Sequence, residues 1–323
     1  MRRFLPLALL LTSVGCIPNY DDDGKDGDLD SDSDADTDGS GSGSGGDTDT
    51  DTVDPSETDD DGDGVTADED CDDDDPDSFP GNDETQDDGA DNDCDGWTDE
   101  IEVCDGVIEE IQEALDEAGR GGVVQVCPGT YVEFLELPDD ITLVSTDGSG
   151  VTEIVAPGGG ASVLSVTDDA TLIGFTLSGG EAENGGGIAC ASADLTLQDI
   201  VVSGNTASGD GGGIYGADCQ VEFDGVRAEG NTAARYGGGI YLTGGRGSIT
   251  GSAAAGNTAY EGGGVFLYET RVDLLESEIV DNVATTVSED DWDAGGGGGG
   301  LWTSSDSAVH GNTIARNASG YNG

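Results

Sequence analysis

Two short acidic loops carry the residues whose type and spacing best suit chemistry. The first loop follows the pattern D-x-D-x-D-G-x5-[D/E], with Asp59, Asp61, Asp63, Gly64 and Asp70. Carboxylates on alternate residues of a tight loop point at one centre, and the acid at the twelfth position closes the shell. The glycine permits the sharp turn, and the next residue, Val65, would add its backbone carbonyl. These oxygens suit a hard divalent cation, so the loop predicts a calcium site.

The second loop repeats this pattern with Asp91, Asp93, Asp95, Gly96 and Glu102, and Trp97 takes the carbonyl position. An EF-hand would need amphipathic helices on both sides of each loop, and the sequence shows none. We therefore expect a helix-free calcium module over residues 59–104 that binds about two Ca²⁺. The competing interpretation is a solvated acidic linker that matches the loop pattern by chance.

The wider pattern of this segment runs from the first loop through DCDDDDP and PGNDE to DGADNDCDGWTDE. It resembles the metal-binding motif of the MopE type, which is found in exported bacterial proteins, over residues 59–100 with Cys71 and Cys94. The resemblance implies copper as a metal. The chain departs from copper chemistry because its one histidine is the distant His310 and its one methionine is Met1. We favour Ca²⁺ and keep copper scavenging as an alternative function.

The N-terminus has the features of an export signal. Arg2 and Arg3 precede an apolar run over 4–14, and small residues then lead to Cys16. The segment resembles a bacterial lipoprotein signal, although Ser13 stands where leucine is usual. The resemblance implies a lipidated Cys16 at the outer membrane, and we expect the protein at the cell surface. The alternative is an ordinary secretory signal, and both interpretations export the chain. Residues 17–58 predict a disordered acidic linker.

Six cysteines remain if Cys16 is lipidated, and an even number in an exported chain favours disulfides. The number of cysteines alone leaves the pairing open. We favour neighbours in sequence order, because each pair then falls within one structural unit: Cys71–Cys94, Cys104–Cys127 and Cys190–Cys219.

The composition excludes several classes of protein. The chain has 323 residues with 71 acidic and 9 basic side chains, and its net charge is −62. Such a polyanion repels phosphates, so we expect no nucleic-acid partner. The 57 glycines disfavour a helical bundle. No apolar stretch reaches the length of a membrane span. About half of the acidic residues lie between positions 21 and 100, so the remainder of the chain is free to form a core.

Residues 105–323 contain a repeat with two markers. A Gly-Gly-Gly run ends at an apolar residue at Ile188, Ile214, Ile240, Val265 and Leu301. An asparagine follows in phase at Asn205, Asn231, Asn257, Asn282 and Asn317. Short alternating runs between the markers predict about three strands per repeat. A coil of about 25–26 residues predicts an all-β fold, a right-handed single-stranded parallel β-helix. Asparagine tolerates the left-handed conformation at tight turns, and stacked amides can bond to one another.

The repeats resemble those of polymorphic outer membrane proteins over about 185–319. The start of the domain is similar to that of pectin-lyase-like β-helices, with an amphipathic segment over 106–118 before VVQVCPGTYVE at 123–133. That resemblance implies a short N-terminal helix that caps the first coil. The sequence stops at SGYNG without a cap. We expect C-terminal truncation, and the alternative is a last coil that pairs with a partner.

Pectin-lyase-like folds also host enzymes, so a polysaccharide lyase or hydrolase is an alternative function. Such enzymes need clustered acids, in lyases beside an Arg or Lys base. We expect no such cluster from the acids Asp199, Glu222, Asp224, Asp273 and Glu276. We also expect no shared column for Arg227, Arg235, Arg246, Arg271 and Arg316. The sequence therefore predicts no enzyme, but a surface-exposed calcium-binding lipoprotein for adhesion, whose shaft binds an extracellular glycan or protein.

Overall fold

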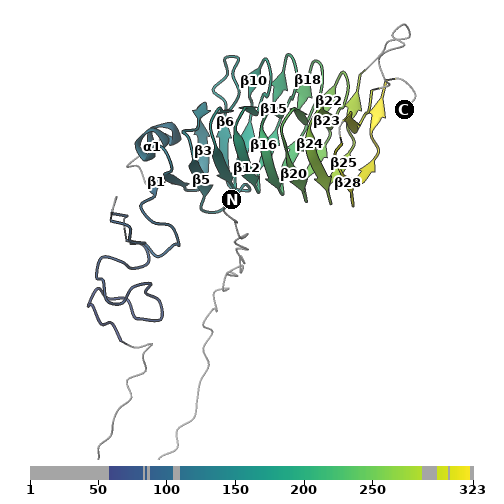
Figure 1. The fold of residues 1–323 in the computed structure, drawn as a ribbon. Coiled ribbons are helices and arrows are strands. Elements are labelled where there is room, and N and C mark those ends of the chain that lie inside the picture. Colours follow the sequence, from purple (N-terminus) through teal and green to yellow (C-terminus); the bar gives the residue numbers. More distant parts are fainter. Residues whose placement is uncertain are drawn as a thin grey trace, which may run out of the picture. The chain divides into compact units, whose positions relative to one another are not determined.

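The structure is a computed structural model that describes residues 58–82, 84–85, 88–104, 110–285, 297–304 and 306–320. The signal segment with Cys16 and the acidic linker up to residue 57 lie outside the described residues. The described strands form four parallel sheets that wind around one core (Figure 1). This is a right-handed parallel β-helix, so the predicted fold class is confirmed.

Each sheet collects one strand from each successive coil. Sheet A contains β1 (Ile101–Val103), β2 (Val123–Val126), β5 (Ile141–Ser145), β8 (Ala170–Ile173), β12 (Asp194–Gln198), β16 (Gln220–Asp224), β20 (Arg246–Thr250), β24 (Arg271–Leu275) and β28 (Val309–His310). Sheet B contains β3 (Gly129–Val132), β6 (Thr152–Val155), β9 (Thr176–Ser178), β13 (Val201–Ser203), β17 (Arg227–Glu229), β21 (Ala253–Ala255), β25 (Glu278–Val280) and β29 (Thr313–Ala315).

The other two sheets begin later in the chain. Sheet C contains β4 (Leu135–Glu136), β7 (Leu164–Val166), β11 (Ile188–Ala191), β15 (Ile214–Ala217), β19 (Ile240–Thr243), β23 (Val265–Tyr268) and β27 (Leu301–Thr303). Sheet D contains β10 (Glu181–Ala182), β14 (Thr206–Ala207), β18 (Thr232–Ala233), β22 (Thr258–Ala259), β26 (Val283–Ala284) and β30 (Ala318–Ser319). A full coil thus has four strands instead of the expected three, because a two-residue strand follows each asparagine of the ladder.

Alternation of apolar and polar residues places one face of each strand in the core. In β12, Leu195 and Leu197 point inward and are buried, while Asp194 and Gln198 are exposed. Their partners one coil later are Val221 and Phe223, which are buried in the same way. Like side chains therefore stack along the axis and form one continuous core.

The helix α1 (Ile111–Ala118) covers the first strands of sheet A, as Figure 1 shows. Its apolar face buries Ile111, Ala114 and Leu115. The carboxylate of Glu133 accepts hydrogen bonds from the N–H groups of Ile111 and Gln112, each at 3.0 Å. These bonds satisfy two donors of the first helical turn. The first residues of the expected helix, 106–109, lie outside the described residues, and β1 belongs to the segment assigned to the acidic module.

Each glycine of a Gly-Gly-Gly run has its own steric reason, as the run at 211–213 illustrates. Gly211 has φ +64°, a conformation that L side chains rarely adopt. A Cβ on Gly212 would lie 2.6 Å from the carbonyl oxygen of Thr232. A Cβ on Gly213 would lie 2.8 Å from Nδ2 of Asn231 in the same coil. The asparagine occupies the space next to the third glycine, so the two markers keep the same phase.

The asparagines form a buried ladder. Oδ1 of Asn257 accepts hydrogen bonds from the backbone N–H and the side-chain amide of Asn231, at 2.9 and 3.1 Å. Nδ2 of Asn257 donates to the carbonyl of Ala228 at 2.8 Å and to Oδ1 of Asn282 at 2.9 Å. The same pattern extends from Asn205 to Asn317. The left-handed residue at this turn is the one before the asparagine, such as Gly230 with φ +63°, so the expected backbone role was wrong.

Three disulfides are present, between Cys71 and Cys94, Cys104 and Cys127, and Cys190 and Cys219. They are the pairs that the sequence analysis favoured. The second joins the end of β1 to the turn after β2, and the third joins β11 to the turn before β16. Among the described residues, no helix has the length and apolar character needed to cross a bilayer.

Candidate metal site

The first acidic loop brings three carboxylates together. One oxygen from each of Asp59, Asp61 and Asp63 lies within 4.8 Å of the others. Backbone N–H groups of the loop hold one oxygen of each side chain: Gly62 donates to Asp59 at 2.7 Å, Asp63 to Asp61 at 3.1 Å and Val65 to Asp63 at 2.7 Å. Gly64 turns the chain with φ +105°. The loop backbone is thus shaped by the carboxylates that the sequence predicted as ligands.

Three carboxylate oxygens of this loop have no hydrogen-bond donor. Oδ2 of Asp61, Oδ2 of Asp63 and Oδ2 of Asp70 are all buried and accept no hydrogen bond. A buried charged oxygen without a partner is unfavourable, and a bound cation would satisfy it. Burial raises the pKa of Asp61, and the negative charges of Asp63, Asp70 and Asp59 raise it further. Three of the predicted carboxylates of the first loop therefore lie together, the charge of Asp70 acts on Asp61, and their chemistry fits a hard cation.

The second loop shows the same arrangement. Oxygens of Asp91, Asp93 and Asp95 lie within 4.8 Å of one another. The N–H of Asp95 donates to Asp91 and to Asp93, each at 3.1 Å, and the N–H of Trp97 donates to Asp95 at 2.9 Å. Gly96 has φ +99°. Burial, and next the charge of Asp95, raises the pKa of Asp93 to about 6. Ligation by the carbonyls of Val65 and Trp97 stays a prediction.

The last predicted ligand of the second loop lies on a strand. Glu102 belongs to β1, where it is the register partner of Gln125 in β2. It lies near enough to Asp93 for its charge to raise the pKa of that residue. It is not part of the tight acidic groups found among the described residues. Its ligand role also stays a prediction.

Two further acids lie at the second loop and were missed by sequence reasoning. Oxygens of Glu84 and Glu100 lie within 4.8 Å of Asp93. Glu84 accepts hydrogen bonds from the N–H groups of Asn92, at 2.6 Å, and Asp99, at 3.0 Å. Burial raises the pKa of Glu100 to about 8. Both acids belong to the acidic pattern over 59–100. Glu84 falls outside the twelve-residue loops, and Glu100 takes a position of the second loop that the pattern leaves open.

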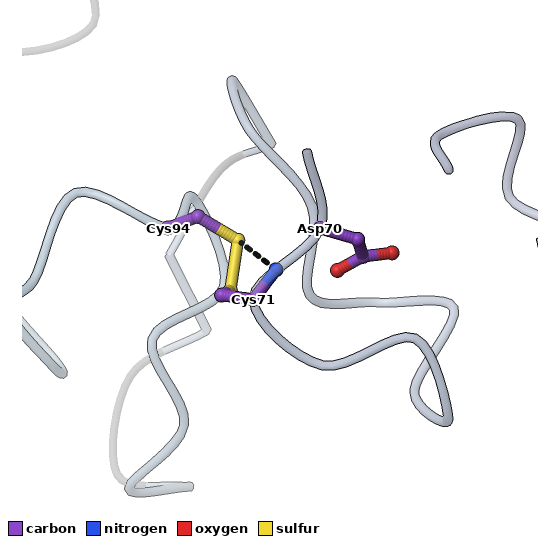
Figure 2. A group of neighbouring side chains, drawn as sticks. All are labelled: Asp70, Cys71 and Cys94. Carbon is purple, nitrogen blue, oxygen red and sulfur yellow. Dashed lines mark hydrogen bonds between the residues drawn. A yellow bond between two sulfur atoms is a disulfide. The ribbon is translucent and has the colours of Figure 1, made fainter. Parts of the chain in front are cut away.

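A disulfide joins the two loops (Figure 2). Cys71 follows Asp70 directly, and Cys94 lies between Asp93 and Asp95. The N–H of Cys71 also donates to Sγ of Cys94 at 3.3 Å. Ligand atoms of Asp70, Cys71 and Cys94 lie within 4.8 Å of one another. The two sulfurs are bonded to each other and are not free thiolates, so Asp70 is the one residue of these three that can bind a metal. The covalent link fixes the end of one loop against the middle of the other.

The β-helix arranges its charged residues differently from our expectation. Arg246 and Arg271 are direct register partners on β20 and β24, so the prediction that the arginines share no column was wrong. Glu222 and Asp273 lie in one column of sheet A, two coils apart. Asp199 and Glu276 both occupy left-handed positions directly after their sheet A strands.

No family model matches the chain, and no curated protein matches it. A pectin methylesterase solved in complex with a hexasaccharide is similar over 68% of this chain and 91% of its own, at 10% identity and a TM-score of 0.38. The pectin methylesterase of Aspergillus niger is similar over 69% of this chain and 86% of its own, at 16% identity and a TM-score of 0.31. A protein of Geobacillus virus E2 is similar over 55% of this chain and 50% of its own length, at 14% identity and a TM-score of 0.31.

The prediction that the chain is not an enzyme is contradicted by these comparisons, because two of the similar structures are enzymes. The prediction rested in part on the belief that the arginines share no column, which was wrong. At 10 and 16% identity the likeness concerns the fold alone, so it assigns neither activity nor substrate to this chain.

Proposed function

We propose that this chain is an exported calcium-binding protein in which the two acidic loops bind about two Ca²⁺ beside the first coil of the β-helix. The ligands are Asp59, Asp61, Asp63 and Asp70 in the first loop. In the second they are Asp91, Asp93, Asp95 and Glu102, and the carbonyls of Val65 and Trp97 complete the two shells. Bound Ca²⁺ offsets the repulsion among these carboxylates and stiffens the segment that precedes the β-helix.

The observation that carries the proposal is the set of three buried oxygens without donors on Asp61, Asp63 and Asp70. Their partner oxygens all accept backbone N–H groups, so each side chain is held in place with one oxygen left over. Oxygen ligands in this arrangement favour Ca²⁺ over copper, which prefers imidazole and sulfur. The MopE-type resemblance of residues 59–100 supports a metal at the same place.

The setting that we propose is the bacterial surface. Three disulfides fit an oxidising compartment outside the cytoplasm. Lipidation of Cys16 would anchor the chain in the outer membrane, and the acidic linker would hold the folded part away from the lipid. The β-helix then presents its sides to an extracellular glycan or protein, since a regular solenoid offers an extended binding surface.

Calorimetric titration of Ca²⁺, with Cu²⁺ in parallel, tests the proposal on the chain without its signal segment. We expect saturable binding of about two Ca²⁺ that is lost in Asp61→Asn combined with Asp93→Asn. A matched control combines Glu222→Gln with Asp224→Asn, because these exposed acids on β16 lie outside the loops. The proposal fails if Ca²⁺ shows no saturable site, or if Cu²⁺ binds tightly and displaces it.

A further inference from the structure

The turn between sheets C and A contains a gap in a column of side chains. The column comprises Ser192, Asp218, Gly244 and Glu269, each two residues before its sheet A strand. All four adopt left-handed backbone conformations, with φ of +59°, +57°, +63° and +49°. Gly244 is the member without a side chain. An ideal Cβ there would clash with the carboxylate of Asp218, so this carboxylate lies over Gly244 in the place that a side chain would otherwise take.

A cavity of about 490 Å³ lies along this turn and the starts of the neighbouring sheet A strands. Asp218 and Glu269 line it on the turn, and Arg246 and Arg271 line it at the starts of β20 and β24. Gly245 contributes backbone, and a Cβ there would overlap the carbonyl oxygen of Cys219. Cys219 is disulfide-bonded to Cys190, so this wall of the cavity is covalently fixed. The cavity is thus a defined feature of the turn, where carboxylates of the turn face the guanidinium groups at the strand starts, and Asp194 adds a carboxylate at the start of β12.

The two arginines are unusual in a chain with a net charge of −62. Four described arginines form ion pairs with carboxylates, namely Arg120, Arg227, Arg235 and Arg316. Within the described residues, Arg246 and Arg271 form no ion pair. They are direct register partners in adjacent coils, where like charges repel each other. An anion bound between them would remove that repulsion.

One of the arginines is already oriented by its neighbours. Nε of Arg246 donates to Oε1 of Gln220 at 2.5 Å, and Nε2 of Gln220 donates to Oδ2 of Asp194 at 2.5 Å. This row follows the register of sheet A from coil to coil. It uses one nitrogen of the Arg246 guanidinium and leaves the terminal nitrogens for a ligand. Arg271 makes no side-chain hydrogen bond to the described part of the chain, so its whole donor fork is free to bind.

We propose that this cavity binds a hydroxylated ligand carrying a single oxyanion, such as one acidic sugar unit within an otherwise neutral glycan. Arg246 and Arg271 would donate to the oxyanion, because guanidinium groups match planar oxyanions with paired donors. Asp218 and Glu269 accept hydrogen bonds only, and they would receive ligand hydroxyl groups. Carboxylates on the rim, with Asp194 close by, would repel a second negative charge, which disfavours a polyanionic chain. The inference goes beyond the calcium-binding function and does not depend on it.

The test titrates glucuronate, glucose 6-phosphate and glucose into the exported full chain by calorimetry, first in excess EDTA and then in Ca²⁺. We expect one or both anionic sugars to bind saturably, with glucose at least tenfold weaker, in both conditions. The two anionic probes distinguish a carboxylate from a phosphate as the oxyanion. Because the loops are empty in EDTA, the result there is separate from the calcium proposal.

Variants locate the binding. Arg271→Gln should weaken binding of the anionic sugar at least tenfold, whereas Arg227→Gln, the same change at an ion-paired arginine on β17, should leave it unchanged. Gly244→Asn should also weaken binding, because its Cβ would displace the carboxylate of Asp218, and asparagine tolerates the left-handed conformation at this position. Thermal unfolding checks that each variant is folded. The inference is overturned if no anionic sugar binds, if glucose binds equally well, or if Arg227→Gln weakens binding as much as Arg271→Gln.

Discussion

Asn231 and Asn257 lie one coil apart, and the side-chain amide of Asn231 donates to Oδ1 of Asn257 at 3.1 Å. The same oxygen accepts the backbone N–H of Asn231 at 2.9 Å, so two donors of one coil depend on one atom of the next. Both residues are 0% exposed, so no water can replace these bonds. The ladder therefore joins neighbouring coils through buried polar contacts, whose loss leaves several groups without partners.

Asn257→Ala should lower the free energy of unfolding by about 3 kcal/mol or more, because each buried group left without a partner costs about 1–3 kcal/mol. The groups affected include the Asn231 amide and the carbonyl of Ala228. Asn317→Ala is the matched control at a half-buried rung, and water can reach the groups it exposes, so its effect should be smaller. Urea unfolding measures the free energy of unfolding of both variants. Equal losses would contradict the role of burial.

Gly213→Ala should destabilise the protein by about 3 kcal/mol, since the added methyl group has no room to relax. Its Cβ would lie 2.6 Å from the carbonyl oxygen of Gly239 and 2.8 Å from Nδ2 of Asn231. Gly204→Asn is the control, because Gly204 has φ +65°, which asparagine tolerates, and open space at the Cβ position. In thermal unfolding, Gly213→Ala should have a clearly lower melting temperature than Gly204→Asn. A tolerated Gly213→Ala would show that the ladder and the glycine run are not sterically linked.

Asp70→Asn should weaken one of the two proposed Ca²⁺ sites at least tenfold, because the amide removes the charge of the buried oxygen. The asparagine can still accept the N–H of Asp72, so the loop should keep its shape. Asp72→Asn is the matched control, since Asp72 is exposed and outside the acidic groups. Calorimetric titration of the two variants measures the difference. Equal affinities would remove Asp70 from the ligand set.

Replacing both Cys71 and Cys94 with serine should weaken Ca²⁺ binding at both loops, because the disulfide holds Asp70 and the Asp93–Asp95 turn in fixed positions. Replacing Cys190 and Cys219 with alanine should leave Ca²⁺ binding unchanged. That second change should lower the free energy of unfolding by about 2–4 kcal/mol. Calorimetric titration of Ca²⁺ and denaturant unfolding are measured on both double variants. A loss of Ca²⁺ binding in the Cys190 and Cys219 variant would contradict the prediction that this disulfide does not affect the loops.

Much of the β-helix could be predicted because its sequence markers have steric causes. The third glycine of each run and the asparagine of the same coil occupy one space, as Gly213 and Asn231 do, so they recur together. The two-residue strands such as Thr206–Ala207 were missed because they are too short to show any alternation.

Some residues of the candidate sites could be predicted from the sequence and others were missed. The twelve-residue loop pattern identified the carboxylates that converge at Asp61 and Asp93, because loop geometry is local in sequence. Glu84 reaches the second loop through the folding of the segment, which spacing does not reveal, and Glu100 stands at a loop position that the pattern does not specify. The pairing of Arg246 with Arg271 was visible, since each follows the apolar residue of its Gly-Gly-Gly run by the same interval, but it was overlooked.

The disulfides have an uneven distribution along the solenoid axis. The three bonds end at Cys219, and the coils that follow are held to one another by hydrogen bonds and packing alone within the described residues. In a solenoid each coil contacts only its neighbours, so unfolding can advance one coil at a time. Under force or heat, the chain should therefore fray from the coils after Cys219 and unzip toward the cross-linked coils. A protease would digest it in the same direction, leaving a resistant N-terminal remnant that a reducing agent would make vulnerable.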